Sequence, residues 1–125
     1  IVCISSDAGR MGEYREAVYS ACKAGIIALS KSVARETGRY GLRLNVVCPG
    51  LVVPPAEESI SEESMWNQMR DIFTDEVRER VERSYPLRRM AKASEIANAV
   101  VFLSSDAASF ITGQTLSVSG GYTMM

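Results

Sequence analysis

Three side chains in the first quarter of the sequence have types and spacings suited to proton transfer at an alcohol or a ketone. Tyr19 and Lys23 are four residues apart, and Ser6 lies thirteen positions before Tyr19 at the end of an apolar run. On a helix, residues four apart share one face, with β-carbons roughly 5–6 Å apart. A free tyrosine ionises near pH ~10, and a neighbouring ammonium such as that of Lys23 favours the phenolate. The Ser6 hydroxyl would orient an alcohol or carbonyl oxygen while Tyr19 moves its proton.

The helix that must carry Tyr19 and Lys23 is predicted over Ala17–Thr37. Small or apolar residues recur there at helical spacing, which is typical of a helix packed closely on a sheet. Gly38 follows directly and is expected to end the helix as a C-terminal cap. The residues expected to face the sheet are Ala21, Ala24, Ala28, Leu29 and Val33.

Three short apolar segments have the character of β-strands. They are Ile1–Ser5, residues 42–48 and Thr115–Ser119. A last helix is expected over Ile96–Ser104, with Ser94 as its N-cap. The alternation of strands and helices predicts an α/β fold built on a parallel sheet with crossover connections.

The order of these elements brings the candidate chemistry to one edge of the sheet. Ser6 follows the first strand, and Pro49 and Gly50 end the second. Ligands of open parallel sheets bind at the carboxyl ends of the strands. We therefore expect Ser6 and the Pro49-Gly50 turn to lie at one ligand site.

The segment Glu57–Tyr85 carries many charges and has apolar residues at near-helical spacing. It is predicted to form a charged amphipathic helix or a pair of helices. Its apolar face either shapes a pocket or is ordinary packing, and the sequence does not choose between the two. The apolar positions are Met65, Trp66, Met69, Ile72, Phe73, Val77 and Val81.

Four motifs spread over the whole chain resemble the C-terminal half of short-chain dehydrogenases/reductases. The resemblance implies a Rossmann-like, doubly wound parallel sheet and an NAD(P)-dependent enzyme that interconverts a secondary alcohol and a ketone. It implies that Tyr19 is the general acid/base, that Ser6 orients the substrate oxygen, and that Lys23 assists Tyr19 and binds the nicotinamide ribose. The motifs are Ser6-Asp7-Ala8-Gly9, Tyr19 with Lys23, Asn45 to Gly50, and Ile111-Thr112-Gly113-Gln114 with Val118-Ser119-Gly120-Gly121.

The same resemblance implies where the cofactor and the substrate bind. Pro49 and Gly50 correspond to the turn against which the nicotinamide lies, and the Val52 backbone would reach its carboxamide. Residues 54–88 would be the substrate lid. The residues implied to contact substrate are Arg10, Leu51, Met65, Trp66 and Met69, whereas Asn45 is expected to be structural.

The chain contains no Gly-rich phosphate loop of the G-x-G-x-x-G type. Residues 1–125 are therefore expected to be the C-terminal part of a single dehydrogenase domain, without its nucleotide-binding half. A catalytic Asn and the residue that selects NAD or NADP would come from that half.

Two positions depart from the family pattern. Pro54, followed by Pro55, stands where many members have a Thr, so a hydroxyl contact to the cofactor is lost. The two prolines would stiffen the connection to the lid. Ser119 stands where many members have Asp, and the sequence offers no functional account of that change.

A finer resemblance is to the 2-hydroxycyclohexanecarboxyl-CoA dehydrogenases of alicyclic acid degradation, which are NAD-dependent and act on a CoA thioester. It slightly favours NAD over NADP. An anionic ligand of this kind would suit a basic residue near the site, with Arg10 as the candidate and Arg88 and Arg89 as alternatives. Arg10 is also readily interpreted as an exposed surface charge.

The composition excludes several classes of function. A net charge of −1 gives no reason to expect nucleic acid or an anionic membrane as partner. No apolar stretch approaches the ~20 residues of a membrane span, so a cytoplasmic location is expected. The absence of histidine argues against a zinc site and a Ser-His-Asp hydrolase. Cys3, Cys22 and Cys48 are expected to be reduced core thiols.

Two alternatives to the interpretation as a dehydrogenase remain. Ser20 and Lys23 form an S-x-x-K sequence, the acylating motif of penicillin-binding proteins, but the S-D-N and K-T-G motifs are absent. The chain could instead be a non-catalytic family fragment or assembly module. The family resemblance implies a homo-oligomer, a dimer or a homotetramer, with the Ala17–Val33 helix at a subunit contact.

Overall fold

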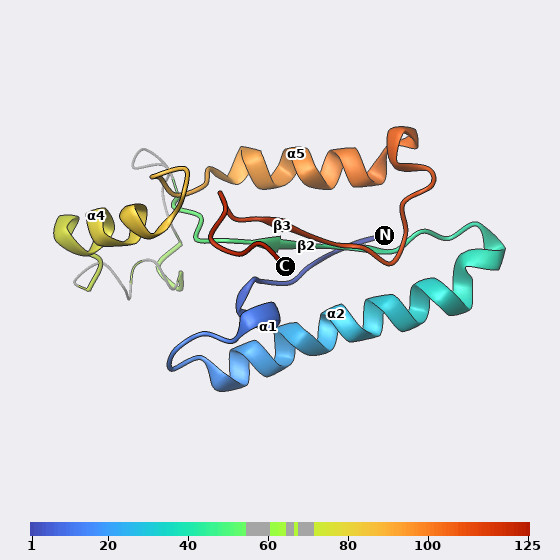
Figure 1. Ribbon diagram of the computed structural model, residues 1–125, viewed down its shortest axis with the longest axis horizontal. Coiled ribbons are helices and arrows are strands. Elements are labelled where there is room, and N and C mark those ends of the chain that lie inside the picture. Colours follow the sequence, from blue (N-terminus) through green and yellow to red (C-terminus); the bar gives the residue numbers. More distant parts are fainter. Residues whose placement is uncertain (55–60, 65–66, 68–71) are drawn as a thin grey trace.

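The chain forms a three-stranded parallel sheet with a helix on each face (Figure 1). The computed structural model describes residues 1–54, 61–64, 67 and 72–125. The strand order is β1-β2-β3, with β1 at Val2–Ile4, β2 at Asn45–Pro49 and β3 at Thr115–Val118. Both pairs are parallel, so the predicted α/β class is confirmed. The second strand begins at Asn45, three residues later than expected.

The central strand β2 forms the core of the molecule. Val46, Val47 and Cys48 are at most 1% exposed, because helices cover both faces of the sheet. Burial on both faces explains why this strand is continuously apolar instead of alternating. Each buried valine contributes roughly 1.5–3 kcal/mol through the area it removes from water. Val47 packs with Leu103, Ala108 and the partly buried Val2, Ile96, Ala99, Val100, Ile111 and Val118.

Helix α2 spans Ala17–Thr37, as the sequence predicts, but it faces the sheet with a different side. The expected stripe of small residues is largely exposed, and Leu29 is 63% exposed. A different stripe with a spacing of three to four residues points inward, and its two fully buried members, Ser30 and Ala34, are themselves small. Of the expected residues, only Val33 lies on this side. The buried and half-buried residues are Ser20, Lys23, Ile26, Ile27, Ser30, Val33, Ala34 and Thr37.

One predicted helix end is confirmed and one is corrected. Gly38 is the C-cap of α2 as predicted, although its φ of −56° is right-handed. The chain continues into a 3₁₀ turn, η1 (Gly38–Tyr40), and the left-handed residue is Gly41, with φ 77°. Ser94 is not an N-cap: helix α5 spans Ala93–Ser104 and Lys92 precedes it.

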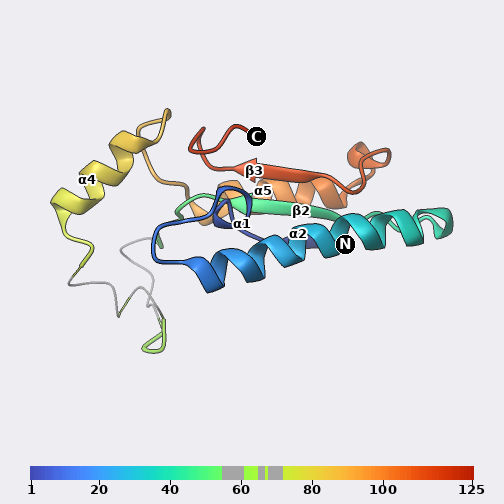
Figure 2. The same cartoon turned by 60° about the horizontal axis from the view of Figure 1, so that its bottom comes forward.

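The remaining elements lie around the site. Helix α1 (Ala8–Met11) is a single turn directly after β1, and α4 (Asp75–Ser84) lies within the segment predicted to be amphipathic and helical. A 3₁₀ turn, η2 (Asp106–Ala108), follows α5. Figures 1 and 2 both show α4 beyond the carboxyl ends of the strands, at the same end as α1 and the start of α2.

The first turn of α5 is held by Glu95. Its carboxylate accepts two hydrogen bonds from Arg89, at 2.6 and 2.7 Å, and one from the Lys92 backbone N–H at 2.9 Å. The Arg89 hydrogen bond and then the Lys92 N–H lower the pKa of Glu95 to about 2. The unfolded value is about 4.3, so the stabilisation is complete above that pH and is lost as the pH falls toward the folded value.

Glu95→Gln is expected to lower the thermal midpoint of the full-length protein at neutral pH. The difference from the parent should narrow as the pH falls below about 4, because the parent carboxylate is then protonated in the unfolded chain. Thermal unfolding across this range measures it. Glu79→Gln removes the exposed α4 ion pair with Arg83 and serves as the matched control, with a smaller effect at neutral pH. A Glu95→Gln difference that does not depend on pH would contradict the prediction.

Candidate active site

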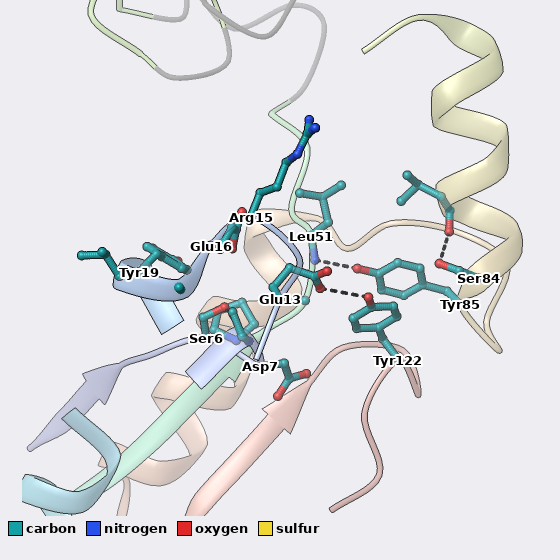
Figure 3. Close-up of a pocket in the computed structure, with 16 residues that line it drawn as sticks. Ser6, Asp7, Glu13, Arg15, Glu16, Tyr19, Leu51, Ser84, Tyr85 and Tyr122 are labelled. Atoms are coloured by element: carbon teal, nitrogen blue, oxygen red, sulfur yellow. Dashed lines mark hydrogen bonds between the residues drawn. The ribbon is translucent and has the colours of Figure 1, made fainter. Parts of the chain in front are cut away.

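A cavity of about 750 Å³ opens at the carboxyl ends of the strands (Figure 3). Its described walls come from the loop after β1, the start of α2, the turn after β2, the end of α4 and the C-terminal turn. The lining residues are Ser6, Asp7, Ala8, Glu13, Arg15, Glu16, Ala17, Val18, Tyr19, Pro49, Gly50, Leu51, Val81, Ser84, Tyr85 and Tyr122.

Tyr19 and Lys23 lie together on α2, as their spacing predicts. The Lys23 Nζ is 5.6 Å from the centroid of the Tyr19 ring and donates a hydrogen bond of 3.3 Å to the Ile4 carbonyl at the end of β1. Tyr19 lines the cavity and is 46% exposed, whereas Lys23 is not part of the wall. The ammonium therefore lies behind the phenol and does not line the cavity itself.

Ser6 lines the same cavity from the loop after β1, whereas Tyr19 lines it from helix α2. Its Oγ accepts a 3.2 Å hydrogen bond from the Ala8 N–H, so it also stabilises the turn into α1. A hydroxyl that accepts one hydrogen bond still has a proton to donate. The Ser6 hydroxyl can thus support the turn and still orient an oxygen in the cavity.

The end of β1 is held against α2 at the level of Lys23. The Ser5 hydroxyl donates a 2.8 Å hydrogen bond to the Lys23 carbonyl. A β-carbon at Gly9 would lie only 2.7 Å from backbone atoms of Lys23 and Ala24, so only glycine allows α1 to approach this closely. These contacts set the position of Ser6 relative to Tyr19.

The turn after β2 brings Pro49, Gly50 and Leu51 to the cavity, as predicted. Val52 is not part of the wall, because it forms a parallel bridge with Ala91. The bridge uses the amide of Val53 and the carbonyl of Leu51, so the Val52 N–H and C=O make no hydrogen bond to any other residue that the structure describes. Those peptide groups remain available to a ligand.

The structure does not bring Arg10 to the cavity, and neither sequence interpretation of this residue is correct. Its side chain is only 13% exposed and lies 4.0 Å from the Asp7 carboxylate, which attracts the guanidinium inward. Arg88 and Arg89 do not line the cavity either, since they bond the Arg83 carbonyl and Glu95 respectively. Three predicted substrate contacts, Met65, Trp66 and Met69, lie outside the described residues.

A buried carboxylate in the cavity wall was missed by the sequence reasoning. Asp7 is 2% exposed, and its Oδ2 accepts a 2.7 Å hydrogen bond from the Ser117 hydroxyl. Ser117 in turn contacts the hydroxyls of Ser119 and Thr123 at 2.8 and 2.9 Å. This gives Ser119 a role, because it supports the Ser117 hydroxyl that bonds Oδ2 of Asp7. Oδ1 of Asp7 has no hydrogen-bond partner among the described residues. The signal was Ser117 and Ser119 at the two-residue spacing that shares a strand face.

Two tyrosines in the wall were also missed. Tyr85 and Tyr122 stack with ring centroids 5.0 Å apart and an interplanar angle of 19°. The Tyr122 hydroxyl donates a 3.0 Å hydrogen bond to Glu13, and the Leu51 N–H donates a 2.9 Å bond to the Tyr85 hydroxyl oxygen. Burial raises the pKa of both tyrosines. No local pattern joins Glu13, Leu51, Tyr85 and Tyr122, which are far apart in the sequence.

Other predicted features have mixed outcomes. Asn45 is structural as expected: it donates to the Ile111 carbonyl at 2.9 Å and accepts from the Gln114 N–H at 3.0 Å. Cys48 is a buried core thiol whose pKa is raised by burial, but Cys22 is exposed, so the prediction that it is a core thiol is wrong. Among the described helices, none combines the length and apolar character needed to cross a membrane.

Comparison with known proteins adds independent information. A family model described as Enoyl-(Acyl carrier protein) reductase matches residues 1–123. The 3-oxoacyl-(acyl-carrier-protein) reductase FabG of Staphylococcus aureus (strain Mu50) is 40% identical over 124 residues, which are 99% of this chain and 45% of that protein. The enzyme of the same name from Escherichia coli (strain K12) is 41% identical over 125 residues, 100% of this chain and 46% of that protein.

Two solved structures are similar to the fold. A short chain dehydrogenase family protein from Francisella tularensis has a TM-score of 0.81 and 31% identity, covering 98% of this chain and 50% of that one. A short-chain dehydrogenase/reductase, glucose/ribitol dehydrogenase, from Brucella melitensis has a TM-score of 0.82 and 32% identity, covering 100% of this chain and 45% of that one. The chain spans about half the length of the curated relatives it matches.

Proposed function

This chain belongs to the short-chain dehydrogenase/reductase family, and we propose that, joined to a nucleotide-binding half, it interconverts a secondary alcohol and a ketone with NAD or NADP. The observation that carries the proposal is the arrangement of Ser6, Tyr19 and Lys23. Ser6 and Tyr19 line one cavity, and the Lys23 ammonium lies 5.6 Å from the centroid of the Tyr19 ring. We refer below to the polypeptide with both halves as the full-length protein.

Each of the three residues has a distinct role in the proposed reaction. Tyr19 gives its proton to the carbonyl oxygen during reduction and removes it from the alcohol during oxidation. Lys23 favours the phenolate, and Ser6 donates a hydrogen bond to the reacting oxygen. The nicotinamide supplies or accepts the hydride.

The described residues fit a nicotinamide. The Pro49-Gly50 turn forms one cavity wall, and the Val52 peptide groups are unused by described neighbours. The Lys23 ammonium, 5.6 Å from the ring of the wall residue Tyr19, is the proposed donor to a ribose hydroxyl. The pyrophosphate would be held by the other half. The comparisons do not support the slight preference for NAD, so either cofactor is proposed without preference.

The relatives suggest the substrate class. Both curated relatives are named as 3-oxoacyl-(acyl-carrier-protein) reductases, so a 3-oxoacyl thioester is the first candidate substrate. An alicyclic 2-hydroxyacyl-CoA is the second candidate. It is less well supported, because Arg10, its expected anion contact, pairs with Asp7. An assay of the full-length protein with 3-oxoacyl thioesters and either nicotinamide tests this, and a failure to turn over any secondary alcohol or ketone would contradict the proposed function.

We include a homo-oligomer, a dimer or a tetramer, in the proposal. Val18 and Leu29 on α2, and Val101 and Phe102 on α5, are exposed large apolar residues. A contact with another subunit would remove these side chains from water, which supports the proposal. The alternative function is a non-catalytic family fragment or assembly module. An acylating enzyme that uses the Ser20–Lys23 motif is not favoured. The Ser20 hydroxyl accepts a 3.2 Å hydrogen bond from the Glu13 N–H, and Ser20 does not line the cavity.

Lys23→Met separates the two roles proposed for the ammonium. In the full-length protein it should weaken cofactor binding roughly tenfold or more, because a charged hydrogen bond is lost. It should also move the pH–rate profile of alcohol oxidation to higher pH, because the phenolate loses its cation. Cofactor titration and a pH–rate series measure the two effects.

Lys31→Met, an exposed lysine two turns further along α2, is the matched control and should change neither quantity. An unchanged cofactor affinity in Lys23→Met would leave Lys23 as an electrostatic partner of Tyr19 only. An unchanged pH–rate profile in Lys23→Met would show that Lys23 does not act as an electrostatic partner of Tyr19.

A further inference from the structure

The Tyr85 hydroxyl is a buried donor with no acceptor among the described residues. Tyr85 follows α4, is 5% exposed and lines the cavity. Its oxygen accepts the 2.9 Å hydrogen bond from the Leu51 N–H. Within the described part of the chain, no atom accepts the proton that the phenol itself carries. A buried donor without an acceptor is destabilising, so a ligand or water that accepts its proton would be bound favourably.

Tyr122, which stacks on Tyr85, has an acceptor for its hydroxyl proton, unlike Tyr85. Tyr122 donates its proton to Glu13 Oε2, and the other oxygen of Glu13 accepts the Tyr14 N–H at 3.0 Å. The Tyr122 hydroxyl is therefore committed, and the Tyr85 hydroxyl is not. Figure 3 shows Tyr85 beside Leu51 and across the cavity from Tyr19.

The position of the Tyr85 ring is closely determined. A β-carbon added at Gly50 would lie 3.2 Å from Cε1 of the ring, and one at Gly120 would lie 3.5 Å from Cδ1. Glycine at both positions therefore leaves room for the ring, and the stack with Tyr122 restricts its movement, whereas the O–H bond can rotate. Such a donor is already oriented before a ligand arrives, which lowers the entropic cost of binding.

The environment keeps the Tyr85 proton in place. Burial is the main cause that raises the pKa of Tyr85, and the Asp7 and Glu13 carboxylates add to it, so the phenol stays neutral at physiological pH. The Leu51 N–H polarises the hydroxyl and makes it a stronger donor. The same carboxylates oppose an anionic ligand at this point.

We propose that Tyr85 donates a hydrogen bond to a second oxygen of the substrate, other than the oxygen held by Ser6 and Tyr19, and that this oxygen is a neutral carbonyl. The inference rests on the proposed function of the site. It makes Tyr85 a specificity-determining residue that selects oxo esters and oxo thioesters over simple ketones, and it disfavours oxo acids with a free carboxylate.

The test compares two substrates in the full-length protein: a 3-oxo thioester and a simple ketone of equal chain length without the second carbonyl. Tyr85→Phe should lower kcat/KM for the thioester roughly tenfold more than for the ketone, as expected for one lost hydrogen bond. The readout is the loss of kcat/KM for the thioester divided by the loss for the ketone. Loss of the Leu51 contact affects both substrates equally and therefore cancels in this ratio. Tyr122→Phe retains a stacked ring and is the control, with an unchanged ratio.

Equal losses for the two substrates would overturn the proposal and leave Tyr85 as a support of the Leu51 turn alone. A second measurement does not depend on turnover. Calorimetry measures the binding of the same two compounds to the Tyr19→Phe protein and to the double variant Tyr19→Phe, Tyr85→Phe. The added Tyr85→Phe change should weaken binding of the thioester and leave binding of the ketone unchanged. If the parent turns over neither compound, the proposed function fails, whereas the binding ratio still decides the role of Tyr85.

Discussion

Tyr19→Phe in the full-length protein is expected to remove nearly all turnover and to leave cofactor binding intact. The substitution removes only the hydroxyl that transfers the proton. The ring that faces the Lys23 ammonium at 5.6 Å is retained, so the local packing is preserved. Steady-state kcat at saturating substrate and titration of the cofactor measure the two quantities separately.

The threshold for this prediction follows from transition-state theory. If Tyr19→Phe retains more than about a tenth of the parent kcat, the barrier has changed by less than ~1.4 kcal/mol and Tyr19 is not the acid/base. Tyr40→Phe is the matched control, because Tyr40 is exposed at the far end of α2. It should leave kcat unchanged.

Gly9→Ala is expected to have the second largest effect, on both stability and activity. The added methyl group would lie 2.7 Å from the Lys23 carbonyl carbon and the Ala24 nitrogen. Both are backbone atoms of α2 and cannot rotate away as a side chain could. Overpacking of this kind costs about 1–3 kcal/mol of unfolding free energy. Because α2 must shift where Lys23 lies, kcat should fall as well.

Denaturant unfolding and kcat of the full-length protein test the Gly9 prediction. Gly38→Ala is the matched control: its φ of −56° suits alanine, and no atom lies within 4 Å of the added β-carbon. It should be neutral or stabilising by up to about 1 kcal/mol. A Gly9→Ala protein as stable and as active as the parent would mean that the contact between α1 and α2 does not position the site.

Regular spacing in the sequence was sufficient for the part of the site that lies within single elements. Tyr19 and Lys23 share a face because the helix repeat requires it, and α2 has the predicted bounds. Ser6 and the Pro49-Gly50 turn meet because the strands before them are parallel neighbours. The first relation follows from the local geometry of a helix, and the second follows from the order of strands in a parallel sheet, so the sequence pattern is enough to predict both.

The choice of buried face on α2 was decided by tertiary packing. The small-residue stripe and the stripe with Ile26 and Ile27 both repeat at helical spacing, and only the sheet distinguishes them. The same holds for Arg10, whose direction depends on the buried Asp7 carboxylate. The local sequence preference for a helix or strand does not indicate which charged group or which surface will pack against a given side chain in the folded protein.

The aromatic and acidic walls of the cavity could not be predicted from sequence, for the same reason. Glu13, Leu51, Tyr85 and Tyr122 come from four segments with no shared repeat, and they are neighbours only because the sheet brings its carboxyl ends together. Sequence alone determined that Tyr19 and Lys23 share one face of α2, because this relation is short-range. Tertiary structure decided what surrounds them, because long-range contacts, burial and the pKa shifts that follow from burial exist only once the chain has folded.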